Sequence, residues 1–310
     1  MKIPTKVYPY RVPYMGGKQN IAYSIMMTIA QKKPNAKYFF DIFGGGASMS
    51  LMAKQFGLKV FYTEKNAGIV NLLNFLKDNK IPKDWIRWIS REEFKQCLGK
   101  DDPFSVFVTV CWSFGNNRQT YLFGKDIEEL KRLAFEVIVN QDEKCLQELR
   151  DKTGLVLTMP KEKTIKNRRL SFCKQIKKVK AFNCGCQALT QIETLSRLAA
   201  GERLQQLEYI QQLEYLQQLE YLQQLEYPYD EVVIYCDPPY RGTAEYIDND
   251  FDHKEFDDWV RKLKYDVFIS EYDCPFEKIA SFNKLSLLDN SKEHKKVVSE
   301  NLYYHKGSTA

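Results

Sequence analysis

Residues 38–56, YFFDIFGGGASMSLMAKQF, contain the pattern that decides the fold. The apolar run 38–43 is typical of a short buried strand, and the run 47–56 can form a helix. Gly44, Gly45 and Gly46 separate the two runs. Glycines at such a turn let the backbone approach a ligand closely, and the helix start that follows offers unpaired amide donors. We therefore expect a cofactor site where this strand meets this helix.

A second strand and an acidic residue follow the turn. Residues 58–62 are mostly apolar or aromatic. Glu64 comes about twenty residues after the glycines, the offset at which nucleotide-binding folds place a ribose-binding acid. Glu64 is therefore expected to bind the sugar hydroxyls of a nucleoside cofactor.

The tetrapeptide Asp237-Pro238-Pro239-Tyr240 directly follows the apolar run 232–236, where a buried strand meets a loop. The Asp237 carboxylate and the Pro238 carbonyl are two hydrogen-bond acceptors, and the Pro-Pro pair fixes the backbone that aims this carbonyl. Two such acceptors can hold the hydrogens of an aromatic amino group, whose lone pair is otherwise delocalised into its ring. Tyr240 can stack on that ring. The tetrapeptide therefore predicts a site that makes a planar amino group nucleophilic.

Four segments of the chain resemble the Dam-type DNA adenine methyltransferases, which methylate the N(6) amino group of adenine with S-adenosylmethionine. Residues 14–18, YMGGK, are similar to the family's GGK segment, which helps to hold the methionine end of the donor. Residues 41–48 resemble its cofactor turn, Glu64 with Asn66 its ribose-binding region, and residues 237–240 its catalytic loop.

The resemblance implies a role for each matched residue. Cofactor-binding roles fall on Tyr14, Gly17, Lys18, Asp41, Phe43, Gly44, Gly45, Gly46 and Glu64. Catalytic roles fall on Asp237, Pro238, Pro239 and Tyr240. Residues 268–272 and 296–303 are similar to later segments of the family, and Ala47 stands where the family's F-x-G-x-G turn has its last glycine.

The order of the motifs predicts the domain organisation. The cofactor turn comes first and the DPPY loop last, and the stretch between them is far longer than a connection inside a sheet requires. We expect an α/β fold, a Rossmann-like methyltransferase sheet with an inserted, mostly helical target-recognition domain. The expected parts are residues 1–77 with the cofactor site, 78–204 as the recognition insert, 205–227 as a six-residue repeat spacer, and 228–310 with the DPPY loop.

Hydrophobic periodicity and turn residues predict the remaining elements. Helices are expected at residues 20–32, 47–56, 67–78, 127–147 and 256–264. Strands are expected at residues 37–41, 58–62, 231–236, 266–270 and 284–288. A mostly parallel sheet built from them would place the glycine turn and the DPPY loop at carboxyl ends of strands.

Basic and amide side chains in the insert predict contacts with double-stranded DNA. Residues 161–169 and 174–180 are dense in Lys and Arg, which favour phosphate contacts, with a solvated basic face as the alternative. Residues 112–121 combine a glycine with amide and guanidinium groups that can pair with base edges, or that can cap one another in a helix-to-loop connection. The DNA-binding candidates are Asn116, Asn117, Arg118, Lys166, Arg168 and Arg169.

Composition limits the class of protein. With 310 residues, 44% of them hydrophobic, the chain can bury a large core. A net charge of +6 permits a polyanionic partner. The first residues lack an apolar core, no apolar stretch has membrane-spanning length, and eight cysteines suit a reducing compartment, so we expect a cytoplasmic protein with no membrane contact. The cysteines are scattered, and the pair at 184 and 186 is isolated, so no metal is expected.

Residues 205–227 repeat the unit Gln-Gln-Leu-Glu-Tyr four times, with a period of six. The residues favour a helix, although the period is not the heptad of a coiled coil. An even period would equally keep the leucines on one face of a strand, and a stack of short turns is a third alternative. We expect a spacer of variable length between the insert and the DPPY part.

These features together predict a site-specific DNA adenine methyltransferase that acts on the N(6) amino group of an adenine flipped out of duplex DNA. Two alternatives are an amino-methyltransferase acting on RNA or on a protein glutamine, and a DNA-binding relative without activity. A cognate restriction endonuclease system is a candidate partner.

Overall fold

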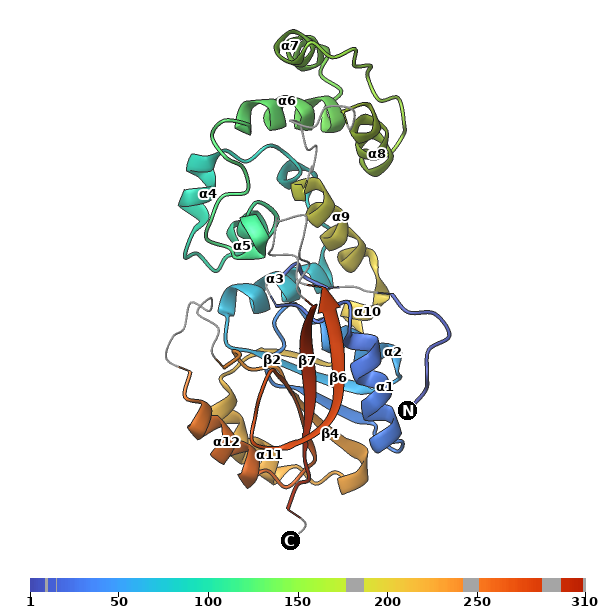
Figure 1. The fold of residues 1–310 in the computed structure, drawn as a ribbon, viewed down its shortest axis with the longest axis vertical. Helices are drawn as coiled ribbons and strands as arrows, with labels where there is room; N and C mark the ends of the chain where they lie inside the picture. Colours follow the sequence, from blue (N-terminus) through green and yellow to red (C-terminus); the bar gives the residue numbers. More distant parts are fainter. Residues whose placement is uncertain (9–10, 15, 177–186, 242–250, 286–296, 309–310) are drawn as a thin grey trace. The chain divides into compact units, whose positions relative to one another are not determined.

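The computed structural model describes residues 1–310 except 9–10, 15, 177–186, 242–250, 286–296 and 309–310 (Figure 1). The chain forms two compact units. The first unit consists of residues 1–11, 16–74 and 201–310, and the second of residues 12–15 and 75–200.

A seven-stranded sheet with the order β3-β2-β1-β4-β5-β7-β6 forms the centre of the first unit. The five strands from β3 to β5 are parallel, whereas β7 is antiparallel to both β5 and β6. The strands are β1 (Tyr38–Asp41), β2 (Lys59–Glu64), β3 (Tyr209–Gln212), β4 (Val232–Cys236), β5 (Val267–Glu271), β6 (Glu277–Leu285) and β7 (Val297–His305). This mostly parallel sheet confirms the expected Rossmann-like α/β class.

Helices cover both faces of the sheet. They are α1 (Ala22–Lys32), α2 (Ser48–Gln55), α3 (Ala67–Asp78), which continues into the second unit, α10 (Glu202–Gln205), α11 (Gln218–Gln224) and α12 (His253–Lys262). The chain moves along the sheet in one direction from β1 through α2 to β2, and in the other direction from β4 through α12 to β5. Because such crossovers are right-handed, α2 and α12 lie on opposite faces (Figure 1).

The central strands are hydrophobic because both of their faces are covered. Every residue of β4 and of β5 is buried. On the α12 face, Phe40, Ile234 and Ile269 pack with Phe256 and Trp259 of that helix. The sheet core thus fixes the strand ends that carry the glycine turn and the DPPY loop.

Most expected elements of the first unit are confirmed. The strands expected at 37–41, 58–62, 231–236 and 266–270 are β1, β2, β4 and β5, with ends within two residues. The helices expected at 20–32, 47–56, 67–78 and 256–264 are α1, α2, α3 and α12. Helix α12 begins earlier than expected, at His253, because the Asp252 carboxylate caps it by accepting from the amides of Lys254 and Glu255.

The strand expected at residues 284–288 is wrong in its start, because β6 begins earlier and spans Glu277–Leu285. Its expected residues 286–288 lie outside the described part of the chain. Strand β6 pairs with β7 along its length, with a register shift between Lys278 and Ala280.

The second unit is helical in the residues that the structure describes. Its helices are α4 (Arg91–Cys97), α5 (Pro103–Cys111), α6 (Glu128–Val139), α7 (Glu143–Thr153), α8 (Ile165–Ile176) and α9 (Gln187–Ala200). An antiparallel bridge between Ser113 and Tyr121 closes the loop after α5.

The single helix expected at 127–147 is wrong, because α6 and α7 are separate helices. Gln141 takes a left-handed φ of 54° between them. The Asp142 carboxylate then caps α7 by accepting from the amides of Lys144 and Cys145. Residues 140–144 are all polar and interrupt the apolar periodicity, and the capping aspartate among them marks a new start.

The repeat adopts none of the three expected regular forms along its whole length. Its first two units supply strand β3, at the edge of the sheet, and its third supplies most of helix α11. Leu207 and Leu222 are fully buried, and Leu222 belongs to the core on the α12 face. These units therefore form part of the folded first unit.

The repeat contains a matched pair of leucines that tests this packing. Leu222 is 0% exposed and Leu216, its equivalent one unit earlier, is 41% exposed. Leu222→Ala should lower the free energy of unfolding by about 3 kcal/mol because it leaves a core cavity. Leu216→Ala should change it by less than about 1 kcal/mol. Urea unfolding followed by circular dichroism measures both, and equal losses would contradict the packing described.

Candidate active site

The glycine turn lies at the carboxyl end of β1 and is held against the end of β2. The Gly44 amide donates to the carbonyl of Thr63 at 2.9 Å, and the Tyr62 hydroxyl donates to the carbonyl of Gly45 at 2.8 Å. A Cβ added at Gly44 would lie 2.1 Å from the Tyr62 ring. Only glycine fits at this position because the tyrosine packs directly on the backbone.

Ala47 ends the turn in a left-handed conformation, with a φ of 60°. Its amide donates to the Gly44 carbonyl at 2.8 Å, so the turn closes on itself before α2 begins. The conformation costs a non-glycine residue about 1 kcal/mol. The alanine at this usually glycine position therefore keeps the glycine backbone shape at some strain.

Glu64, at the end of β2, is hydrogen-bonded to the backbone of the glycine turn. Its carboxylate accepts from the Gly45 amide at 2.8 Å and from the Asn66 amide at 2.9 Å. Asp41, at the end of β1, is 1% exposed and accepts from both the amide and the hydroxyl of Ser50. The two acids thus join the turn to β2 and to α2.

The DPPY loop begins at the carboxyl end of β4, the strand next to β1. Asp41 and Tyr235 are paired in the register of these strands, and the Ile42 amide donates to the Tyr235 carbonyl at 3.0 Å. Asp237 therefore emerges beside the glycine turn, although the chain passes through the whole insert between them.

Lys18 reaches Asp237 across a separation of 219 residues. Its Nζ lies 2.5 Å from Oδ1 of Asp237 and 3.3 Å from Oε1 of Glu300. The same ammonium lies 4.8 Å from the centre of the Tyr240 ring. Lys18, Glu300 and Tyr240 are all buried, at 4%, 3% and 8% exposure. With Asp237, whose side chain is 20% exposed, they form one largely buried charged cluster.

Burial dominates the electrostatics of this cluster. Burial raises the pKa of Asp237 to about 6, with Lys18 opposing the shift and Glu300 adding to it. Burial also raises the pKa of Asp41 and of Glu271 to about 7. Carboxyl groups thus gather at these strand ends around one lysine ammonium, which is a suitable surrounding for a cationic ligand.

The other residues predicted to bind the cofactor or to act in catalysis differ in their burial and in the unit to which they belong. Phe43 is half-buried, with its ring centre 5.4 Å from that of Tyr215. Pro238 is buried, Pro239 is half-buried, and the backbone of Gly46 is buried within the turn. Tyr14 belongs to residues 12–15, which group with the second unit, and Gly17 precedes Lys18 in the first.

Glu300 and Glu271 are site residues that sequence reasoning missed. Glu300 lies on β7, and Glu271 at the end of β5 accepts from the amides of Arg241 and Tyr272. Glu271 ends the mostly apolar strand β5, which was an available signal, whereas Glu300 stands between Ser299 and Asn301 in β7 and has no such signal. Their proximity to Asp237 depends on pairing between strands that no local pattern encodes.

The candidate DNA-binding residues of the loop after α5 shape the loop itself. Asn117 accepts from the amides of Gln119 and Thr120, and Asn116 accepts from the side chain of Gln191. Arg118 has a left-handed φ of 58°, and its Nε donates a hydrogen bond to the Thr109 hydroxyl. Asn117 thus caps the loop, whereas Asn116 and Arg118 contact side chains of α9 and α5, and contact of these three residues with DNA stays a prediction.

The three basic candidates on α8 differ in their surroundings. Lys166 is exposed. Arg168 donates to the carbonyl of Val139 at 3.0 Å, and Arg169 forms an ion pair with Glu193 at 2.9 Å. Lys166 is therefore the most accessible of the three, and residues 177–180 of the second basic cluster lie outside the described chain.

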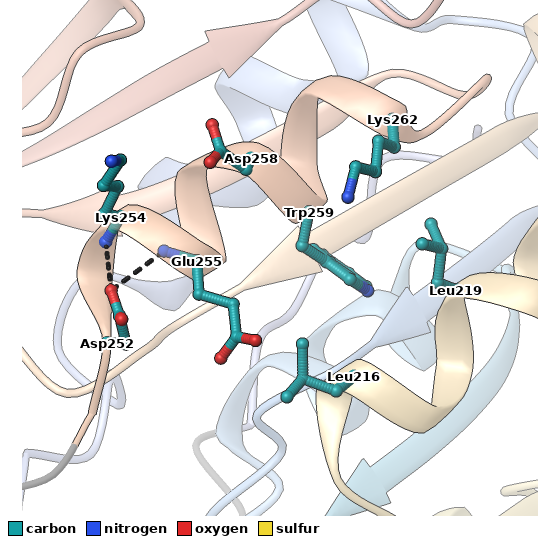
Figure 2. Close-up of a pocket in the computed structure, with 8 residues that line it drawn as sticks. All are labelled: Leu216, Leu219, Asp252, Lys254, Glu255, Asp258, Trp259 and Lys262. Atoms are coloured by element: carbon teal, nitrogen blue, oxygen red, sulfur yellow. Dashed lines mark hydrogen bonds between the residues drawn. The ribbon is translucent and has the colours of Figure 1, made fainter.

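A separate pocket of about 310 Å³ lies between α12 and the repeat (Figure 2). The Trp259 indole points between Leu216 and Leu219, and acidic and basic side chains of α12 form the rim (Figure 2). None of the expected catalytic or cofactor residues lines this pocket, so the strand ends described above are the candidate active site.

Comparison with known families agrees with this geometry. The family model described as D12 class N6 adenine-specific DNA methyltransferase matches residues 14–303. The chain belongs to this family. It is an adenine-specific DNA methyltransferase, and the resemblance to Dam-type enzymes is confirmed. No curated protein matched the chain.

Among the described residues of this methyltransferase, no helix is long and apolar enough to cross a membrane. No group of three or more His, Cys, Asp or Glu side chains among those residues is arranged to hold a metal ion.

The charged cluster makes opposite predictions for two substitutions. Lys18→Met removes the cation that lowers the pKa of Asp237, so this pKa should rise above about 6. Glu300→Gln removes the anion that raises it, so the pKa should fall. Carbon-13 NMR titration of labelled aspartate, assigned with Asp237→Asn, measures both. Lys32→Met, which removes a partly exposed ammonium from α1, is the control and should cause no shift. Shifts of one sign in both cluster variants would contradict this arrangement.

Proposed function

We propose that this methyltransferase transfers the methyl group of S-adenosylmethionine to the N(6) amino group of an adenine flipped out of duplex DNA. One observation carries the proposal. The Lys18–Asp237 pair, at the end of β4, lies beside the glycine turn at the end of β1. A donor held by the turn and an amino group held by Asp237 would therefore be neighbours.

The residues present fit this donor. S-adenosylmethionine supplies an electrophilic methyl group on a positively charged sulfonium when bound. Asp41 and Glu300 are buried carboxyl groups, Asp237 is a partly buried one, and Lys18 pairs with both Asp237 and Glu300, which favours a positive ligand over a neutral or negative one. Glu64 sits at the turn with its carboxylate on the Gly45 amide, where ribose hydroxyls can replace that contact.

Asp237 performs the central step in this proposal. Lys18 holds Oδ1, so Oδ2 is directed to one hydrogen of the amino group, and the Pro238 carbonyl accepts the other. The nitrogen then keeps its lone pair for the methyl carbon. One proton must leave the nitrogen after transfer, and Asp237, with a pKa of about 6, can take it up and pass it to water.

Tyr240 is placed to hold the base. Its ring lies 4.6 Å from that of Tyr272, edge to face, and the Lys18 ammonium lies over it. A ring fixed in this way can stack on an adenine that has left the helix, because the amino nitrogen is inaccessible inside a stacked duplex. We assign no such role to Phe43, whose ring packs against Phe251 and Phe256.

We assign target recognition to the insert expected at residues 78–204, most of which belongs to the second unit. Lys166 provides an exposed cation, and Phe114 is 56% exposed on the loop that Asn116, Asn117 and Arg118 shape. In this assignment the amides and the arginine set the loop conformation, and base contacts come from the surface it presents. A cytoplasmic location fits the free thiols of the described cysteines.

The proposed roles of Asp237 and Glu64 predict different effects when each carboxylate is removed. Asp237→Ala should lower methyl transfer at least about a thousandfold, because the amino group loses its acceptor. Its donor affinity should stay within a few-fold of the parent. Glu64→Ala should instead weaken donor binding by about ten- to a hundredfold, the loss of charged hydrogen bonds. Tritium transfer to duplex DNA, RNA and protein, with calorimetry of donor binding, measures both.

Asp273→Ala, on the exposed loop after β5, is the matched control and should retain activity. An Asp237→Ala enzyme that methylates duplex DNA at the parent rate would refute the catalytic role. Faster labelling of RNA or protein than of DNA would refute the proposed acceptor.

The DNA assignment rests on an exposed charge. Lys166→Ala should weaken binding to all sequences alike and reduce the slope of log affinity against log salt by about 0.9, the effect of one lost phosphate contact. Lys152→Ala removes an equal charge from the exposed side of α7 and should leave the slope unchanged. Fluorescence anisotropy at several salt concentrations measures the slopes, and identical slopes for parent and Lys166→Ala would exclude this contact.

A further inference from the structure

The second and third units of the repeat lie against the donor side of the active site. Strand β3 pairs with the end of β2, so that Thr63 is opposite Gln211 and Glu64 is opposite Gln212. The Leu213 amide then donates to the carbonyl of Glu64 at 3.0 Å. The chain of the repeat therefore passes directly beside the ribose-binding acid.

Gln218, at the start of α11, returns to the same place. It is 2% exposed, and its Oε1 accepts from the Thr63 hydroxyl at 3.1 Å. The carbonyl of this Thr63 holds the Gly44 amide of the glycine turn. The Nε2 of Gln218 is buried and has no hydrogen-bond partner among the described residues. A buried amide donor left unpaired costs stability, so such a group indicates a ligand acceptor that completes it.

Tyr215 is a second side chain of the repeat that lies near the glycine turn. Its ring lies 5.4 Å from Phe43, the residue before the glycine turn, and 5.5 Å from Trp259 of α12. Beyond it, Leu216 and Leu219 face Trp259 (Figure 2). The Tyr215 side chain of the repeat thus packs against Phe43 and restricts its position.

We propose that these two units form a wall of the donor site, in which the Gln218 amide donates to the nucleoside part of the methyl donor and Tyr215 positions Phe43. This inference rests on the proposed use of S-adenosylmethionine. It assigns a binding function to a segment that looks like a spacer. The number of units then affects donor affinity, because a shorter repeat that keeps β3 has too few residues left for η3 (Tyr215–Gln217) and α11.

The repeat supplies its own controls, since each residue recurs in a different environment. Gln224 occupies the position of Gln218 one unit later and is exposed on the same helix. Tyr221 occupies the position of Tyr215 one unit later and is 46% exposed. A substitution can therefore be made twice in nearly the same local sequence, once inside the wall and once outside it.

Gln218→Leu should raise the dissociation constant of S-adenosylhomocysteine about three- to tenfold, the effect of one neutral hydrogen bond. It should raise that of 5′-methylthioadenosine, which lacks the amino-acid part, by the same factor. The rate at saturating donor and the affinity for DNA should stay within twofold of the parent. Gln224→Leu should match the parent in every measurement. Calorimetry, DNA anisotropy and thermal melts of the full chain measure these quantities.

Substitutions of Tyr215 test the inference independently. Tyr215→Ala should weaken binding of both nucleosides, Tyr215→Phe should restore it because the ring is kept, and Tyr221→Ala should have no effect. A parent enzyme that binds donor, with unchanged affinity in both Gln218→Leu and Tyr215→Ala, would overturn this inference and leave the proposed function standing. Equal losses in the control variants would also overturn it. A parent that binds neither nucleoside would refute the proposed donor itself.

Discussion

The parallel pairing of β1 with β4 is the constraint on which the active site depends. It sets Asp41 opposite Tyr235, so the glycine turn and the DPPY loop leave the sheet at the same edge, one strand apart. Strand order reverses at this pair, which is where open α/β sheets form their binding crevice. Lys18, from the segment before α1, reaches Asp237 at this edge.

The charged cluster at this edge is poorly compensated within the protein itself. The buried carboxylate of Glu300 and the partly buried one of Asp237 share the Lys18 ammonium, and Asp41 and Glu271 have raised pKa values because of burial. Buried charges of this kind seldom add stability, since their desolvation offsets the attraction between them. Their arrangement is therefore better explained by what they bind, and a cationic donor would supply the missing positive charge.

Local pattern was sufficient for the parts of the site that lie in one continuous segment. The glycine turn, Glu64 and the DPPY loop follow their own strands, and each is found at the end of that strand. Glu300 could not be assigned in this way, because it comes to Asp237 through the antiparallel pairing of β7 with β5. The break between α6 and α7 does have a local signal, since residues 140–144 are all polar and include the capping Asp142, and the single helix expected there overlooked it.

The repeat shows most clearly where local sequence stops determining structure. Side chains alternate along a strand, so a period of six presents the same residues on the same face, and any unit could supply β3. Around a helix, six residues turn through about 240° beyond a full turn, so equivalent residues face different directions. This is why Gln218 is buried while Gln224, on the same helix, is exposed. Any unit could therefore supply β3, whereas the units are not interchangeable in α11. The structural role of a unit depends on its position relative to Glu64 and Phe43, and not on its sequence.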